Sequence, residues 1–190
     1  MEQIKIGFKT YSLTWEIQNE HRIVIHKDKK YEYIHFDDLE EYKRYIEVNK
    51  SLNKHGITIP KIVSKSKKEL IIIRQYIDKE NCLIDLSKNE LEEKAIELLF
   101  NMYRFARLYK FDLDYHPDNY CYKDGKLYYL LNEMYKKDPK HSLEEEGLFY
   151  WINSSTLNNY LIDHNLPKLE HVLSKAEANK KVVLLGVKYW

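Results

Sequence analysis

The residues with the clearest chemical potential lie in one short polar stretch, Asp114-Tyr115-His116-Pro117-Asp118-Asn119. Transfer of a phosphoryl group from ATP uses a carboxylate that orients or deprotonates the acceptor hydroxyl, and an amide oxygen about five residues further on that holds a metal ion. Asp114 and Asn119 have the residue types and the spacing for these two tasks. Asp, Asn and Pro are also common in turns, because Asp and Asn side chains hydrogen-bond their own backbone. The flanking elements must decide between a phosphotransfer site and a plain turn.

The N-terminal part of the chain is expected to form a sheet that is interrupted by one helix. Its strand segments alternate apolar and polar side chains and are rich in β-formers. Asp37, followed three residues later by Glu40, has the form of a capping box for a helix that runs to Gly56. The predicted strands cover residues 4–8, 12–17, 22–26, 57–63 and 69–77.

The C-terminal part is expected to be mainly helical, which makes the whole chain α+β. Ser87 and Glu90 form a second capping box, which opens an amphipathic helix over 90–110. The polar stretch follows this helix, and a hairpin over 120–131 follows the polar stretch. Further helices are expected from residue 142 onward, and Pro167 is predicted to start the last one.

With these surroundings the chain resembles the protein-kinase-like superfamily, and in particular its small atypical branch. The form Asp-x-His-Pro-x-Asn is similar to the catalytic loop of aminoglycoside and choline phosphotransferases and of the heptose kinases of lipopolysaccharide. The resemblance covers roughly residues 4–135. It implies a two-lobed α+β fold, with an N-lobe over 1–79 that holds a five-stranded sheet and one helix. A minimal helical C-lobe over 80–190 would carry the catalytic-loop-like segment 112–119 and the hairpin 120–131.

The resemblance also implies an activity and a metal site. The protein would bind ATP with Mg²⁺ and move the γ-phosphoryl group to a hydroxyl of a small molecule or a protein, with Asp114 as the acceptor-orienting base. Asn119 would hold metal. The second metal ligand is expected about thirteen residues after Asn119, where the chain has Asn132 with Glu133 beside it. An amide is a weaker ligand than a carboxylate for a hard cation, so loss of metal binding is an open alternative.

The phosphate-binding part departs further from the family. The loop that covers the phosphates should be rich in glycine, but here it offers Gly7 alone. Lys27 is the best match for the strand lysine that pairs with the phosphates. Its helix partner should be a glutamate near position 45, where this chain has Tyr45, so Glu41 or Glu47 would have to substitute.

These departures leave a second function open, a catalytically impaired pseudokinase that acts as a protein-binding module. Its protein partner would bind through the C-terminal region, which is apolar for a chain end. A third possibility is an unrelated α+β domain with a chance motif.

Composition restricts the class of protein. Lys and Arg number 31 and Asp and Glu number 30, which gives a net charge of +1 and makes a nucleic-acid partner unlikely. The longest apolar runs fall far short of the roughly 20 residues that a membrane helix needs. The start of the chain shows no apolar targeting segment. We therefore expect a cytoplasmic protein without a membrane span.

Overall fold

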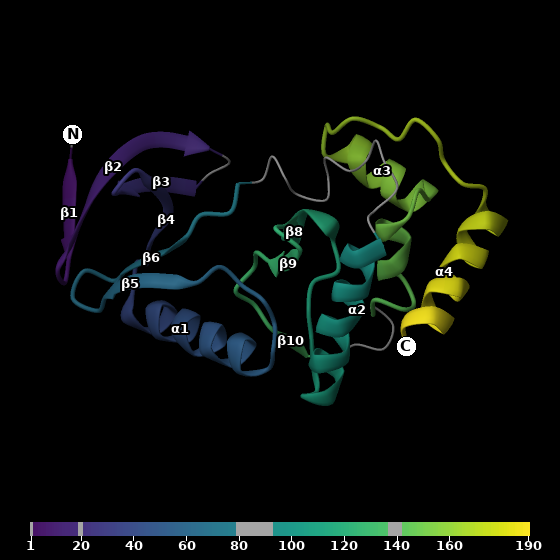
Figure 1. The fold of residues 1–190 in the computed structure, drawn as a ribbon, viewed down its shortest axis with the longest axis horizontal. Helices are drawn as coiled ribbons and strands as arrows, with labels where there is room; N and C mark the ends of the chain where they lie inside the picture. The colour runs from purple at the N-terminus through teal and green to yellow at the C-terminus, as the bar shows by residue number, and fades with distance from the viewer. Residues whose placement is uncertain (1, 19–20, 79–92, 137–141) are drawn as a thin grey trace. The chain divides into compact units, whose positions relative to one another are not determined.

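The structure is a computed structural model that describes residues 2–18, 21–78, 93–136 and 142–190 (Figure 1). It is a mixed α and β structure, as the sequence predicts. The chain divides into two units. The first comprises Met1–Ser51 and Ile59–Asp78, and the second comprises Leu52–Thr58 and Lys79–Trp190.

The first unit is built on a six-stranded antiparallel sheet, so the prediction of five strands is wrong. Its strands are β1 (Gln3–Ile6), β2 (Lys9–Gln18), β3 (His21–His26), β4 (Lys29–His35), β5 (Ile62–Ser66) and β6 (Ile71–Gln75). They lie in the order β1-β2-β3-β4-β6-β5. The strand missed from the sequence is β4, which pairs with β3 from His26↔Lys29 onward. Lys27 and Asp28 make the turn with φ of 49° and 60°, a conformation that usually favours glycine. Because neither residue is a glycine, the sequence did not indicate this hairpin.

The two faces of the sheet bury different clusters. One cluster contains Tyr11 of β2, Val24 of β3 and Ile71 and Ile73 of β6. The opposite face packs Ile72 against helix α1 (Leu39–Lys54). Alternation along β6 places neighbouring isoleucines on opposite faces, which is why this strand reads as a continuous apolar run.

Helix α1 begins one residue later than predicted. The Oδ1 of Asp38, rather than that of Asp37, accepts the backbone N–H groups of Glu40 at 2.7 Å and Glu41 at 2.8 Å. These are two of the donors that a helix start leaves unsatisfied.

The segment Leu52–Thr58 belongs to the second unit and contacts other residues of that unit. The backbone N–H of Tyr129 donates to the carbonyl of Thr58 at 2.8 Å. Gly56 has a φ of +79°, and a Cβ there would lie 3.2 Å from the ring of Phe105. Both the turn and this close approach therefore require glycine.

Among the residues that the structure describes, the second unit contains three α-helices, two 3-10 helices and four short strands. Its elements are α2 (Glu93–Leu108), β7 (Phe111–Asp112), η3 (Pro117–Asn119), β8 (Tyr120–Lys123), β9 (Lys126–Tyr129), β10 (Tyr135–Lys136), η4 (Gly147–Trp151), α3 (Ser155–Asp163) and α4 (Lys175–Tyr189). The predicted helix, polar stretch and hairpin are confirmed in this order. The proposed cap at Ser87 and Glu90 lies outside the described residues.

The last helix does not start at Pro167. Ser174 caps α4 by accepting the backbone N–H of Glu177, and the Glu177 side chain accepts the backbone N–H of Ser174. This reciprocal capping box, which the sequence analysis overlooked, is a stronger start signal than a proline. Within the described part of the chain, no helix is both long enough and apolar enough to cross a membrane.

The end of α4 is held against α2. The ring of Trp190 lies 5.0 Å from that of Phe100, and the guanidinium of Arg107 lies 4.0 Å from the Trp190 ring centroid. Trp190 therefore packs against α2 within the second unit.

Candidate functional site

The polar stretch is positioned by the end of α2 and by two short strand pairs. Lys110, with a φ of 63°, turns the chain from α2 into β7. Residues of β7 pair with β10, which follows the hairpin, through Tyr135↔Asp112 and Lys136↔Phe111. The chain therefore returns after the hairpin to the entrance of the loop, as expected for a site built from both segments.

Asp114 is the centre of a compact hydrogen-bond arrangement. Its Oδ1 accepts the backbone N–H of His116 at 2.8 Å and the Nδ2 of Asn119 at 2.9 Å. It also lies 2.9 Å from the Nδ1 of His116, which donates this bond when it carries the proton. Among the described residues, none hydrogen-bonds to Oδ2. One oxygen of the carboxylate is thus fixed by the loop, and the other can accept a hydrogen bond from a ligand.

The electrostatics keep Asp114 ionised. Burial opposes its charge, but the hydrogen bonds from His116 and Asn119 and the charge of His116 outweigh burial and lower the Asp114 pKa. In turn, the hydrogen bond to Asp114 raises the His116 pKa against burial, with help from the negative charges of Asp114 and Asp118. A carboxylate of lowered pKa orients a hydroxyl well and is a weak proton acceptor. The pair is 26% and 30% exposed in its side chains, so solvent reaches it.

Three aromatic side chains from distant elements fix the backbone of the loop. The Tyr103 hydroxyl donates to the carbonyl of Leu113 at 2.9 Å. The Tyr120 hydroxyl donates to the carbonyl of Asp114 at 2.6 Å. The indole N–H of Trp151 donates to the carbonyl of residue 115 at 2.6 Å. All three side chains are at most 2% exposed, so they set the loop from within the core. The sequence analysis missed them because residues 103, 120 and 151 form no motif.

Aromatic rings also surround His116. Its ring centroid lies 4.9 Å from that of Tyr115, 4.8 Å from that of Tyr150 and 5.4 Å from that of Tyr160. The Tyr160 hydroxyl hydrogen-bonds to Asp118, and burial followed by this bond raises the Tyr160 pKa. Asp114 and these rings therefore fix the orientation of the His116 imidazole, which in turn orients the Asp114 carboxylate.

Two of the proposed metal ligands, Asn119 and Glu133, make hydrogen bonds within the chain. The side-chain amide N–H of Asn119 donates to Asp114, and the backbone carbonyl of Asn119 accepts the backbone N–H of Leu130 at 2.8 Å. Glu133 is exposed, and its carboxylate accepts the hydroxyl of Tyr135. Asn132 is half-buried. Across the described ranges, no three His, Cys, Asp or Glu side chains are grouped to hold a metal. A site with one exposed carboxylate and two amides fits Mg²⁺ poorly.

The residues proposed to bind phosphate lie in two turns and in one helix of the first unit. Gly7 is in the turn between β1 and β2, and Lys27 is exposed in the turn between β3 and β4 rather than within a strand. Glu41 is exposed in the first turn of α1. The strand directly before α1 is β4, which was not predicted, so Lys27 does not lie in that strand.

Glu32 of β4 belongs to a buried network with Arg74 of β6 and Tyr45 of α1. Glu32 accepts the Nε of Arg74 at 2.6 Å and its Nη2 at 2.9 Å. The Nη1 of Arg74 donates to the hydroxyl of Tyr45 on α1 at 2.9 Å. The side chains of Arg74 and Glu32 are 9% and 8% exposed. Burial raises the Tyr45 pKa to about 12, so its hydroxyl stays protonated. Tyr45, which stands where a glutamate was expected, therefore belongs to the buried network of Glu32 and Arg74.

Comparisons with known proteins add no family to this description. No protein-family model matches the chain, and no curated protein matches it. The kinase-like assignment therefore depends on the Asp114 motif and the order of elements.

Proposed function

We propose that this chain is a kinase-like protein with impaired phosphotransfer, which uses its fold and its Asp114 site for binding. The observation that carries this proposal is the buried network of Glu32, Arg74 and Tyr45. In a kinase-like N-lobe, the strand before the helix supplies a lysine that attracts the nucleotide phosphates. Here that strand supplies Glu32, whose charge repels phosphate, and the nearby cation Arg74 donates to Glu32 and Tyr45.

The metal ligands support the same proposal. Asn132 is a neutral amide at the expected carboxylate position, and Glu133 already accepts a hydrogen bond from Tyr135. Weak divalent-ion affinity follows, because Mg²⁺ binds mainly through carboxylates and phosphates. We infer that ATP with Mg²⁺ is bound weakly or not at all.

A second candidate function is an active atypical phosphotransferase, and the geometry of Asp114 favours it. A hydroxyl-bearing acceptor could donate its proton to Oδ2 while its oxygen forms a bond to the γ-phosphorus of ATP and ADP leaves. A small molecule is the preferred acceptor, and a protein side chain is second. Asn119, five positions after Asp114, keeps the spacing that this reaction needs.

A protein partner through the C-terminal region remains part of the proposal. On α4, Val183 is 63% exposed, Leu184 is 57% exposed and Val187 is 81% exposed. Apolar side chains that are this open support partner binding in this region.

The test is thermal unfolding with and without millimolar ATP together with Mg²⁺ or Mn²⁺. A ligand at a hundred times its Kd stabilises the folded state by about 2.7 kcal/mol. For a chain of this size that corresponds to roughly 5–10 °C in Tm. We expect no metal-dependent shift for the unaltered protein, and none for Asn132→Asp, because the missing lysine also limits binding.

The control is Asp114→Asn, which keeps the shape of the side chain. A metal-dependent shift in the unaltered protein, together with phosphate transfer to a sugar or amino-alcohol acceptor that Asp114→Asn abolishes, would overturn the proposal in favour of the active enzyme. A shift gained only by Asn132→Asp would show that the metal site alone was lost.

A further inference from the structure

Two tight hairpin turns lie at the same end of the sheet in the first unit. The turn between β1 and β2 and the turn between β3 and β4 each contain two residues. The two hairpins are neighbours, because β2 pairs with β3 through Ser12↔Ile25 next to the turns. Adjacent strands lie about 4.8 Å apart, so the side chains of both turns can reach one common surface. We call residues 6–9 and 26–29 the turn end.

Phe8 lies at the tip of the first turn and is left in water. It is fully exposed, at 106% of its reference area, and is the most exposed of the large apolar residues that the structure describes. Gly7 before it has a φ of +60°, a conformation in which a side chain is strained. The turn therefore requires the glycine, but it does not require a phenylalanine, since turn positions usually hold small or polar residues. Because a phenyl ring gains free energy when it leaves water, Phe8 is suited to contact with an apolar phase.

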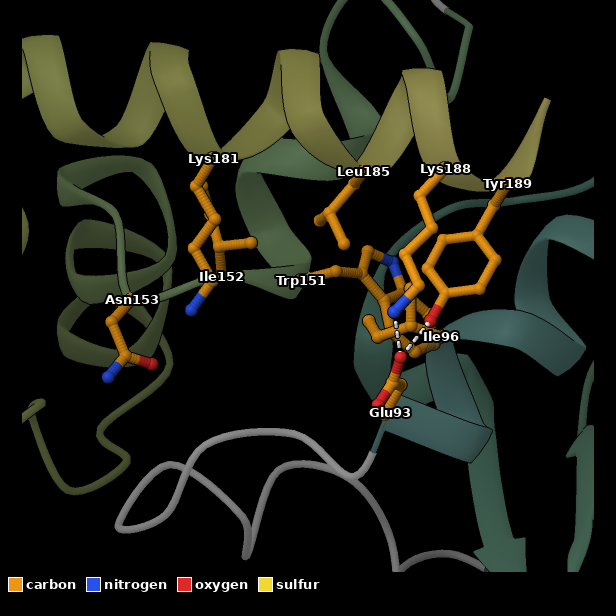
Figure 2. Close-up of a pocket in the computed structure, with 9 residues that line it drawn as sticks. All are labelled: Glu93, Ile96, Trp151, Ile152, Asn153, Lys181, Leu185, Lys188 and Tyr189. Atoms are coloured by element: carbon orange, nitrogen blue, oxygen red, sulfur yellow. Dashed lines mark hydrogen bonds and ion pairs between the residues drawn. The ribbon is translucent and has the colours of Figure 1, made fainter.

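The turn end is also positively charged. It carries Lys9, Lys27 and Lys29 against a single aspartate. No described carboxylate forms an ion pair with any of these three lysines. Lys188 of the second unit differs in this respect, since the carboxylate of Glu93 accepts its ammonium group (Figure 2). The charges of the turn end are therefore available to an anionic partner.

A lipid surface fits this combination better than other anionic or apolar partners. A second copy of the chain would bring the lysines of two turn ends together, and like charges repel. Proteins that bind single-stranded nucleic acid stack bases on aromatic platforms along a basic groove, whereas Phe8 lies at the tip of a protruding turn. The headgroup layer of an anionic membrane surrounds an inserted apolar tip with phosphate groups. It therefore satisfies the ring and the lysines at the same time.

We propose that the turn end binds the surface of an anionic lipid membrane. Phe8 enters the boundary between headgroups and acyl chains, and the ammonium groups of Lys9, Lys27 and Lys29 lie at the level of the lipid phosphates. The proposal goes beyond the proposed function and does not depend on it. It uses no residue of the Asp114 loop and none of the buried ion pair of the sheet.

The test is co-sedimentation of the full chain with sucrose-loaded vesicles. One set contains phosphatidylcholine alone, and the other also contains about 30% phosphatidylserine. We expect binding to the anionic vesicles only. The binding should weaken when NaCl is raised from about 0.1 M to about 0.5 M, because salt screens the lysines. In Phe8→Trp, the emission gained over the unaltered protein should be quenched by brominated acyl chains, which shows insertion of the ring.

Matched variants separate the turn end from the rest of the chain. Phe8→Ser should weaken binding to the anionic vesicles by about tenfold or more. Lys27→Gln combined with Lys29→Gln should weaken it by about 25-fold, at roughly fivefold for each lysine. The control is Lys67→Gln combined with Lys68→Gln, in the turn between β5 and β6 at the opposite end of the sheet, and it should leave the binding unchanged.

The substituted side chains are all exposed, so the Tm of each variant should stay close to that of the unaltered protein and show that it is folded. The proposal is overturned if neither kind of vesicle binds, if both bind equally, or if Phe8→Ser has no effect. It is also overturned if the control lysines have the same effect as those of the turn end. A single-stranded oligonucleotide that competes with the vesicles and no longer binds Phe8→Ser would overturn it in favour of a nucleic-acid partner.

Discussion

Replacing Glu32 with glutamine should strongly destabilise the first unit. The change removes the negative charge and leaves the Arg74 guanidinium buried beside a neutral amide. The two bonds of 2.6 and 2.9 Å join side chains that are only 8–9% exposed, so solvent screens the lost attraction little. Breaking such a buried pair costs about 3–5 kcal/mol, a large part of a typical stability of roughly 5–15 kcal/mol. With a urea m-value of about 2 kcal/mol/M, the midpoint should fall by roughly 1.5–2.5 M.

The paired replacement Glu32→Leu with Arg74→Met is the control. Because both charges are removed together, its stability should recover to within about 2 kcal/mol of the unaltered protein. Tyr45→Phe should cost less, about 1.5–3 kcal/mol, since it deletes one hydrogen bond to a charged group. Urea unfolding followed by circular dichroism measures all of these variants. A cost below about 1 kcal/mol for Glu32→Gln, or a paired replacement as unstable as the single one, would refute the assignment of this network as a buried structural ion pair.

Two further predictions concern the second unit. A Cβ at Gly147 would lie 2.8 Å from the Cγ of Tyr115, so Gly147→Ala should cost about 1–3 kcal/mol in urea unfolding. At Gly186, inside α4, a Cβ meets nothing closer than 3.8 Å, so Gly186→Ala should instead stabilise by about 0.5–1 kcal/mol; equal effects would contradict the packing described. The His116 pKa, measured by NMR, should lie above its usual value of 6.5 and should fall toward it in Asp114→Asn. Because the folded pKa is the raised one, the stability that His116 contributes is complete below about pH 6.5 and is lost as the pH rises through the folded pKa. An unchanged His116 pKa in Asp114→Asn would contradict the ion pair.

The elements of this fold were predictable where the signal is local. The amphipathic period of α2 and the Asp124-Gly125 turn of the β8–β9 hairpin are properties of short windows, and both predictions are confirmed. Strand β4 was missed because its turn uses Lys27 and Asp28, which adopt positive φ without a glycine to mark it. Because of this missed strand, Lys27 lies in a turn and not in the strand directly before α1.

The site was predictable only in part, for the same reason. Asp114 and Asn119 lie five positions apart, so their contact follows from the local chain, and the structure brings them together at 2.9 Å. The network of Glu32, Tyr45 and Arg74 joins residues 29 and 42 positions apart. Sheet pairing creates this contact, since Glu32 and Arg74 are direct partners in the register of β4 and β6. Without the strand order, no spacing in the sequence could indicate it.

The turn interpretation of the polar stretch and the binding interpretation are not exclusive. The bond from the His116 backbone to Asp114 Oδ1 is what a turn-forming aspartate makes. A turn needs no more than this, yet the same oxygen also meets the His116 imidazole and the Asn119 amide. The Asp114 carbonyl is fixed as well, by Tyr120. Keeping a partly buried carboxylate charged requires such compensation. The arrangement therefore holds one carboxylate oxygen in a fixed position at a partly exposed surface, which is a requirement of ligand binding and not of chain reversal.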